Sequence, residues 1–232
     1  MQIKVVRDVL DANKTVAGQM RAEYADLGVF VLNLMSSPGS GKTTLLQKTL
    51  AALSGQLKIA VIVGDICTTN DAERLAKSAD VPVTQICTDA FGGDCHLAAH
   101  VVREAAAGLT LAGLDLLIVE NVGNLVCPAE FDIGEDKRAV VLSVTEGEDK
   151  PLKYPLMFQV CDVALLSKVD LLPHLDYSVK LARQAIQDVH PGLTVIEVSS
   201  KTGQGLEAWY AWIIQQVKEK KEQRAGDQGG GG

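Results

Sequence analysis

The sequence predicts an α/β domain built on a mostly parallel, seven-stranded sheet with helices on both faces. Short apolar runs alternate with segments of helical periodicity from residue 29 onward, which is the pattern of parallel strands joined by right-handed helical crossovers. In addition, 47% of the 232 residues are hydrophobic but only 4% are aromatic. Such a composition suits an aliphatic core in which parallel strands are buried on both faces.

The first element expected is a helical lead-in at residues 1–27, which packs on the domain. Apolar side chains recur at roughly helical spacing over residues 4–27, with a break near Asn13, and Gly28 is typical of a helix end. Strands are expected at 29–35, 58–64, 83–87, 115–120, 139–144, 163–167 and 194–198. Helices are expected at 42–53, 70–79, 95–107, 178–189 and 205–221. The domain should therefore span residues 28–221, and residues 222–232 are expected to form a flexible tail.

Composition also narrows the class of function. The net charge is −7 without a strongly basic block, which argues against a nucleic-acid partner. Apolar runs stay well short of the ~20 residues that span a bilayer, so we expect a cytoplasmic protein without membrane insertion. Five cysteines, an odd number, favour thiol or metal roles over disulfides in a reducing compartment. Cys67, Cys87 and Cys161 lie in or near apolar strands and are expected to be small core residues.

The segment Ser36-Ser-Pro-Gly-Ser-Gly-Lys-Thr-Thr44 lies between a predicted strand and a predicted helix. This context is that of a P-loop NTPase, in which backbone N–H groups at a helix N-terminus surround a phosphate. Ser36 stands where the general pattern has glycine, and the alternative is a chance Gly/Ser-rich loop, which the flanking strand and helix disfavour. The candidate phosphate-binding residues are Gly39, Ser40, Gly41, Lys42, Thr43 and Thr44.

Two later segments indicate guanine as the base. Ser167-Lys-Val-Asp170 follows a predicted strand, and the Asp170 carboxylate can accept hydrogen bonds from guanine N1–H and the 2-amino group, which adenine cannot offer in that geometry. The stem of Lys168 can lie over the base. Ser167 replaces the usual asparagine of this motif and is expected to weaken the bracing between loops. The second segment, which would support the base, comprises Ser199, Ser200 and Lys201. The alternative is a solvated charged turn.

Acidic residues follow two predicted strands, at Asp65 and Glu120. Because strand ends of a parallel sheet face the ligand crevice, both are candidates, with Thr43, for Mg²⁺ binding and, with Lys42, for catalysis. Gly123 could offer its N–H to a γ-phosphate. The alternative role for both acids is helix capping.

Hydrolysis is expected to be slow and regulatory. We identify neither a glutamine placed to position water nor an arginine finger within the chain. Lys150 and Lys153, which follow the strand at 139–144, either reach a nucleotide across a dimer or are surface charges. Lys153 is taken as a nucleotide-binding candidate.

Cysteine and histidine residues suggest a second, metal-binding site. Cys95 and His96 open a predicted helix in which His100 follows one turn later, and Cys127 comes after the Glu120–Gly123 segment. Thiolate and imidazole ligands suit Zn²⁺ or Ni²⁺, and a thiolate at a helix N-terminus is a better ligand. A buried structural cysteine with a capping histidine is the alternative. Since one chain supplies only three or four ligands, a closed site could require a second subunit.

These motifs together resemble the HypB-type hydrogenase nickel-incorporation GTPases, a dimerising P-loop class that also includes the urease nickel GTPase. The match runs from the P-loop through Cys95-His-Leu97, Glu120-Asn-Val-Gly-Asn-Leu-Val-Cys-Pro128 and Thr145–Pro155 to Ser167–Asp170. The stretch from 87 to 95 looks longer than usual, and Ala98 replaces a frequent aspartate.

The resemblance implies GTP/GDP and Mg²⁺ binding, GTP-dependent homodimerisation, and Ni²⁺ and/or Zn²⁺ bound by Cys95, His96 and Cys127, with His100 as an extra ligand. It also implies nickel delivery to a [NiFe]-hydrogenase large-subunit precursor, with a zinc-containing HypA-type partner. The alternatives are a metallochaperone GTPase for another enzyme such as urease, and a non-hydrolysing metal-binding interaction protein. The intact P-loop argues against the second alternative.

Overall fold

The computed structural model describes residues 6–65, 70–88 and 95–229. Its centre is a seven-stranded sheet in which all adjacent strands run parallel, in the order β3-β2-β4-β1-β5-β6-β7. The strands are β1 (Phe30–Ser36), β2 (Ile59–Asp65), β3 (Val83–Cys87), β4 (Leu116–Gly123), β5 (Lys137–Ser143), β6 (Val163–Ser167) and β7 (Thr194–Val198). The predicted fold class and all seven strands are confirmed.

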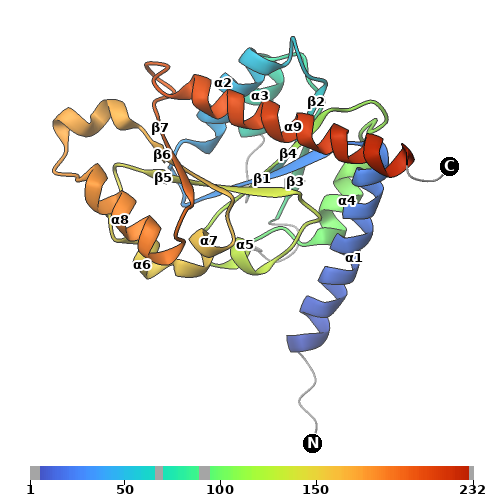
Figure 1. Ribbon diagram of the computed structural model, residues 1–232, viewed down its shortest axis with the longest axis horizontal. Helices are drawn as coiled ribbons and strands as arrows, with labels where there is room; N and C mark the ends of the chain where they lie inside the picture. Colours follow the sequence, from blue (N-terminus) through green and yellow to red (C-terminus); the bar gives the residue numbers. More distant parts are fainter. Residues whose placement is uncertain (1–5, 66–69, 89–94, 230–232) are drawn as a thin grey trace, which may run out of the picture.

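Helices cover both faces of the sheet, as Figure 1 shows. On one face lie α2 (Lys42–Leu53), α3 (Asn70–Ser78) and α9 (Leu206–Gly229). On the other face lie α1 (Val6–Leu27) and α4 (Ala99–Ala107), followed by α5 (Cys127–Glu130), α7 (Pro155–Gln159) and α8 (Val179–Val189). The short α6 (Lys150–Lys153) and a 3₁₀ helix, η2 (Val169–His174), complete the list. Among the described helices, none combines the length and the apolar character that a membrane crossing requires.

Alternation along β1 explains why both faces are buried. Leu32 and Leu34 pack in the cluster beneath α2 and α9, whereas Val31 packs against α1 and α4. Each of these side chains is at most 1% exposed. On the first face, the Trp209 indole N–H of α9 donates to Thr49 Oγ1 of α2 at 3.0 Å, which joins the two helices. The sheet is thus a rigid support that presents its strand ends to the loops above it.

The N-terminal helix α1 continues through Asn13, where a break was predicted. Asparagine usually weakens a helix by bonding to nearby backbone. Here its side-chain amide donates to Asp132 O at 2.7 Å and accepts from Ala99 N at 2.8 Å, so its polar atoms are satisfied by distant segments. Gly28 does end the helix as predicted, with a positive φ of 72°.

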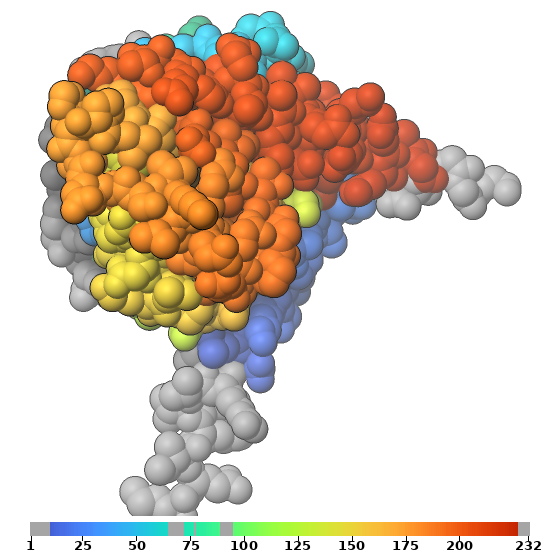
Figure 2. All heavy atoms as spheres, turned by 60° about the vertical axis from the view of Figure 1, so that its left-hand side comes forward, coloured from blue at the N-terminus to red at the C-terminus, as the bar shows by residue number. Residues whose placement is uncertain are grey.

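The C-terminal helix α9 runs to Gly229, so residues 222–229 are helical where a flexible tail was predicted. Lys218 pairs with Glu222 one turn away, and Arg224 donates to Leu27 O at the end of α1. The bond from Arg224 links this part of α9 to α1. In Figures 1 and 2, the ends of α1 and α9 near the chain termini project from the body of the molecule.

Candidate functional site

The predicted phosphate loop connects β1 to α2, as its motif requires. Gly41 precedes the helix with a φ of 96°, a left-handed conformation that favours glycine. Lys42 is buried, and its Nζ donates to Ser36 Oγ at 2.8 Å. The loop borders a cleft of about 360 Å³. The cleft is lined by Pro38, Gly39, Ser40, Gly41, Lys42, Thr43, Thr44, Val63, Gly64, Arg74, Glu120, Asn121, Val122 and Gly123.

Two predicted magnesium ligands meet in this cleft. Thr43 Oγ1 donates to Glu120 Oε1 at 2.8 Å, and Glu120 is 4% exposed. A hydroxyl and a carboxylate are the hard oxygen donors that Mg²⁺ prefers, so this pair fits the ion. Asp65 ends β2, but its side chain lies outside the described residues. Gly123 lies against the loop, because a Cβ there would be only 3.0 Å from Pro38 Cα.

A second cavity of about 270 Å³ lies on the other side of the phosphate loop. Ser199 Oγ donates to Asp170 Oδ1 at 2.6 Å and thereby orients the carboxylate. Lys168 has a φ of 61°, and its Nζ donates to Gly39 O at 2.6 Å. The lining residues are Ser40, Gly41, Thr44, Ser167, Lys168, Asp170, Leu171, Ser200 and Lys201. The structure thus places the residues predicted to read the base in one cavity beside the phosphate loop.

Ser167, which was predicted to weaken the bracing between loops in place of asparagine, still makes one bond between them. Ser167 Oγ donates to Ser40 O at 2.7 Å, and this bond ties the base-side loop to the phosphate loop. The shorter side chain suffices because β6 carries Ser167 close to the loop backbone. Ser40 itself borders both cavities, and its buried hydroxyl has no hydrogen-bond partner among the described residues. A ligand that extended across both cavities would supply one.

Lys150 and Lys153 do not line either cavity. Lys153 pairs with Asp149 at 2.6 Å, and its side chain is 61% exposed. Lys150 Nζ lies 3.7 Å from Glu146. Glu146 is a residue that sequence reasoning missed: its carboxylate accepts from Ser37 Oγ of the phosphate loop and from Ser143 N. This carboxylate connects the start of the phosphate loop to the segment that carries both lysines.

A second residue missed from the sequence is Arg74. It lies on α3 and lines the phosphate-side cleft, and its guanidinium donates to Gln47 Oε1 of α2 at 3.2 Å. A cation at this cleft adds to the positive charge of Lys42. The sequence marked Asp71–Arg74 as part of the family resemblance and residues 70–79 as a helix, but neither observation assigned Arg74 a role at the cleft.

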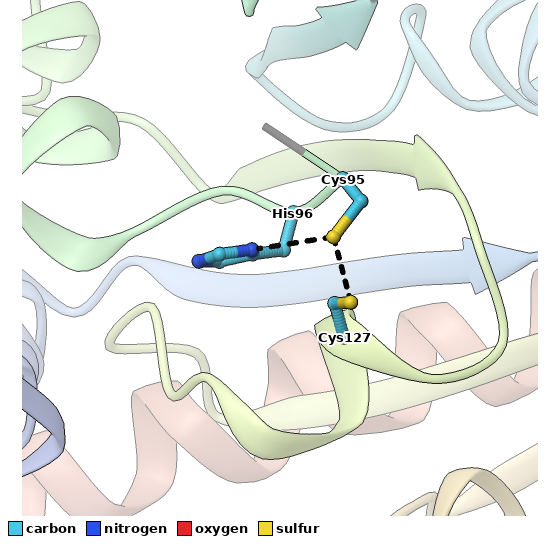
Figure 3. Close-up of side chains that lie close together, drawn as sticks. All are labelled: Cys95, His96 and Cys127. Atoms are coloured by element: carbon cyan, nitrogen blue, oxygen red, sulfur yellow. Dashed lines mark hydrogen bonds between the residues drawn. The ribbon is translucent and has the colours of Figure 1, made fainter. Parts of the chain in front are cut away.

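Three of the four predicted metal ligands come together (Figure 3). Cys95 Sγ lies 2.6 Å from Cys127 Sγ and 3.8 Å from His96 Nδ1. The candidate ligand atoms of the three residues all lie within 4.8 Å of one another. All three residues are partly exposed, and the His96 ring stacks on Phe131 with centroids 3.7 Å apart. Two sulfur donors and one nitrogen donor fit Ni²⁺ or Zn²⁺, and leave room for a further ligand.

His100 is not part of this cluster, which corrects the prediction. The helix begins at Ala99 rather than Cys95, so Cys95 and His96 lie before it, and the assumed one-turn spacing of the two histidines does not apply. His100 is exposed on α4. Cys127, not Cys95, opens a helix, the four-residue α5.

The remaining cysteines divide into three cases. Cys161 is buried as predicted, and burial raises the pKa of its thiol. Cys87 is exposed at the end of edge strand β3, contrary to the prediction. Cys67 lies outside the described residues.

The ligand segments are anchored at their far ends by a buried polar network. Arg138 of β5 donates to Ala129 O at 3.3 Å and pairs with Glu135. Burial raises the pKa of Glu135, although the Arg138 charge opposes this shift. Glu135 also accepts from Asn33 of β1 at 3.2 Å, and Asn33 accepts from Asn121 of β4 at 3.1 Å. The network therefore connects the segment after Cys127 to the two strands that carry the phosphate loop and the Glu120–Gly123 segment.

On the surface of this network, Arg21 of α1 donates to Asp132 Oδ1 at 2.6 Å. Burial opposes ionisation of Asp132, but the hydrogen bonds that the carboxyl receives, from the Arg21 side chain first and then from the Gly134 backbone, together with the Arg21 charge lower its pKa overall. The hydrogen bond between the two side chains raises the pKa of Arg21. Asp132 also accepts from Gly134 N at 2.8 Å, so the turn between α5 and β5 is held from both sides.

Comparisons with known proteins agree with this arrangement. Residues 30–197 match the family model described as "CobW/HypB/UreG, nucleotide-binding domain". Hydrogenase maturation factor HypB of Azotobacter chroococcum mcd 1 is 50% identical over 216 residues, which cover 92% of this chain and 69% of the relative. The HypB of Escherichia coli K12 is 47% identical over 211 residues, which cover 91% of this chain and 71% of the relative.

Two solved structures are also similar. The crystal structure of HypB from Helicobacter pylori in complex with nickel has a TM-score of 0.84 at 39% identity, and the match covers 90% of this chain and 97% of that one. The crystal structure of HypB from Archaeoglobus fulgidus has a TM-score of 0.82 at 34% identity, with 89% and 99% coverage.

Proposed function

The chain belongs to the HypB members of the CobW/HypB/UreG GTPase family, and from this premise we propose that it couples GTP binding and hydrolysis to nickel delivery during [NiFe]-hydrogenase maturation. One observation carries the proposal. The segment Glu120–Gly123 lines the phosphate-side cleft, and Cys127, four residues after Gly123, lies with its Sγ 2.6 Å from Cys95 Sγ in the thiol cluster. A single short stretch of chain therefore belongs to both sites.

The nucleotide half of the proposal assigns a role to each residue of the two cavities. Lys42 and the loop amides bind the phosphates, and Asp170, oriented by Ser199, recognises guanine. Thr43 and Glu120 would hold Mg²⁺, which when bound neutralises charge on the phosphates. We assign the N–H of Gly123 to the terminal phosphate, and this assignment is supported by its place in the cleft lining next to Pro38 of the loop.

Asp65, Lys42 and Glu120 are the proposed catalytic residues, and hydrolysis is proposed to be slow. Since Lys153 is exposed and its partner Asp149 is also about half exposed, Lys153 is available to a nucleotide held by a second subunit. The GTP-bound homodimer is proposed from the family resemblance, and the exposure of Lys153 is compatible with it.

The metal half assigns nickel, as cargo, to Cys95, His96 and Cys127. A relative from Helicobacter pylori was solved in complex with nickel. The thiols need a reducing compartment to stay available, which favours the cytoplasm. The proposed partners are the hydrogenase large-subunit precursor, which receives the metal, and a HypA-type protein, which supplies or accepts it.

One comparison favours urease as a second enzyme that receives the metal. The Helicobacter pylori J99 relative, 39% identical over 221 residues, is a hydrogenase/urease maturation factor. Complementation of strains that lack their own maturation GTPase distinguishes the two possibilities. Restored hydrogenase activity without restored urease activity supports hydrogenase as the single target enzyme.

The central test measures nickel and zinc bound per chain in the GDP form and in the form loaded with a non-hydrolysable GTP analogue. We expect the affinity or stoichiometry to depend on the nucleotide, and this dependence to disappear in Cys127→Ala. The matched control is His100→Ala, an exposed histidine near but outside the cluster, which should behave as the unmodified protein. Metal binding that ignores the nucleotide would contradict the coupling and leave a structural metal.

A further inference from the structure

We propose that Asn124 is the positioning residue that transmits the state of the nucleotide cleft to the nickel ligands. This inference rests on the function proposed above and specifies which contact carries the coupling. Asn124 follows Gly123, the last residue of β4 and a lining residue of the phosphate-side cleft. It lies three residues before Cys127, in the loop that leads to α5.

The Asn124 amide joins the two segments that carry the metal ligands. Its Nδ2 donates to the carbonyl oxygen of Cys95 at 3.3 Å. Its Oδ1 accepts from Val126 N at 2.8 Å, which fixes the turn immediately before Cys127. The Asn124 side chain therefore sets the position of the Cys95 backbone relative to the Cys127 backbone. The residue before it, Gly123, lies against Pro38 of the phosphate loop.

Two further contacts of these segments lead to helices and strands that pack on the sheet. Beyond Cys127, Arg138 of β5 holds Ala129 O. Beyond His96, Asn13 of α1 caps the first N–H of α4 through Ala99 N. Both anchors come from regular elements that pack on the sheet and do not line the cleft. The segment that carries His96 is thus held at Ala99, and the segment that carries Cys127 is held at Ala129. A displacement of Gly123 then moves Asn124, which links the two segments beside Cys95 and Cys127.

The consequence is a change in the distances between the metal-ligand side chains, rather than a general increase in the mobility of the site. If Gly123 moves when the terminal phosphate enters or leaves, Asn124 moves with it and shifts Cys95 relative to His96 and Cys127. Nickel affinity then differs between the two nucleotide states, because a metal site tolerates little displacement of its ligands. By linkage, nickel changes the relative affinity for the two nucleotides by the same factor.

Asn13 provides a matched control. Like Asn124, it is an asparagine whose amide bridges a backbone carbonyl and a backbone N–H, donating to Asp132 O at 2.7 Å and accepting from Ala99 N at 2.8 Å. These bonds also hold the two ligand-bearing segments, but from α1. Its removal should weaken nickel binding in both nucleotide states by the same factor.

The experiment measures the nickel dissociation constant of the full chain by competition with a chromophoric chelator, in the GDP form and in the GTP-analogue form. Thiolate-to-nickel absorption confirms that the cysteines remain ligands. In the unmodified protein we expect the two constants to differ by roughly fivefold or more, the lower end of ordinary coupling. In Asn124→Ala the ratio should fall to about one, whereas in Asn13→Ala it should be unchanged.

Asn124→Ser is a second variant that keeps the turn folded, since its hydroxyl can still accept from Val126 N but cannot reach the Cys95 carbonyl. It should still bind nickel, but with the same dissociation constant in both nucleotide forms. If both Asn124 variants retain the difference in nickel affinity between the two nucleotide forms, the inference is overturned and the proposed function stays intact. If Asn13→Ala loses this difference to the same extent, the inference is also overturned, because loosening the ligand segments at any point would then have the same effect. If the unmodified protein binds nickel equally well in both nucleotide forms, the coupling in the proposed function fails and the inference fails with it.

Discussion

Replacing Asp170 with asparagine tests the base-binding cavity most directly. In the structure one carboxylate oxygen, Oδ1, already accepts from Ser199 Oγ at 2.6 Å. An amide in this place keeps its oxygen toward that hydroxyl and turns its NH₂ toward the cavity. One charge-assisted hydrogen bond to guanine is lost, at about 1.5–3 kcal/mol, and a donor is left facing a donor, at about 1–3 kcal/mol more.

Together these effects predict a loss of about 2.5–6 kcal/mol in Asp170→Asn, or roughly a 60- to 20,000-fold weaker affinity for GDP. Xanthosine diphosphate should bind the variant better than GDP does, because its C2 carbonyl accepts from the new amide. Titration calorimetry with the diphosphates of guanosine, xanthosine and adenosine measures all three affinities. Ser199→Ala, which removes only the orienting hydrogen bond, should cost about 1 kcal/mol. If Asp170→Asn discriminates between GDP and ADP as the unmodified chain does, the carboxylate does not read the base.

Three further outcomes are expected. Lys42→Ala removes the buried ammonium of the phosphate loop and should weaken GTP and GDP at least about 100-fold; near-normal affinity in equilibrium dialysis would refute its phosphate role. Asp132→Asn should lower the free energy of unfolding by about 1 kcal/mol at pH 7. Since the Asp132 pKa is lowered in the fold, this contribution is complete above the unfolded pKa of about 3.9 and is lost as the pH falls through the folded value; urea denaturation at a series of pH values should show the difference shrinking, and a constant difference would contradict the ion-pair explanation. Leu165→Ala, at a fully buried position of β6, should cost about 2–5 kcal/mol in the same assay, and a loss below 1 kcal/mol would mean that the core there collapses around the cavity.

The sheet could be predicted because its signals are local. Apolar runs such as those of β1 and β6 are short and aliphatic, and the phosphate-loop motif fixes which strand precedes which helix. The same locality allowed Asp170 and Ser199 to be placed in one site, since both follow strands whose carboxyl ends share an edge of the sheet. For these residues, sequence position and spatial position are linked by the parallel topology.

The metal cluster was only partly predictable, because the start of α4 is decided by a distant side chain. Ala98 precedes the helix without a side-chain cap of its own, and the capping oxygen comes from Asn13. A search for local caps cannot find it, so the helix was started too early and His100 was taken as a ligand. Glu146 and Asn124 were missed for the same reason: their hydrogen bonds join segments that are separate in the sequence.

The contact between Trp209 and Thr49 has a practical consequence for spectroscopy. The chain has two tryptophans, and Trp212 stacks on Trp209 with ring centroids 5.5 Å apart. Trp209 therefore reports on α2, the helix that begins with Lys42, and Trp212 is linked to it by the ring stack; both lie on the opposite face of the sheet from α5. Intrinsic fluorescence is thus a built-in probe of the phosphate-loop helix, and a shift of the emission wavelength on adding nickel, which quenching by the metal does not itself produce, would be an optical sign that the metal site acts through the sheet.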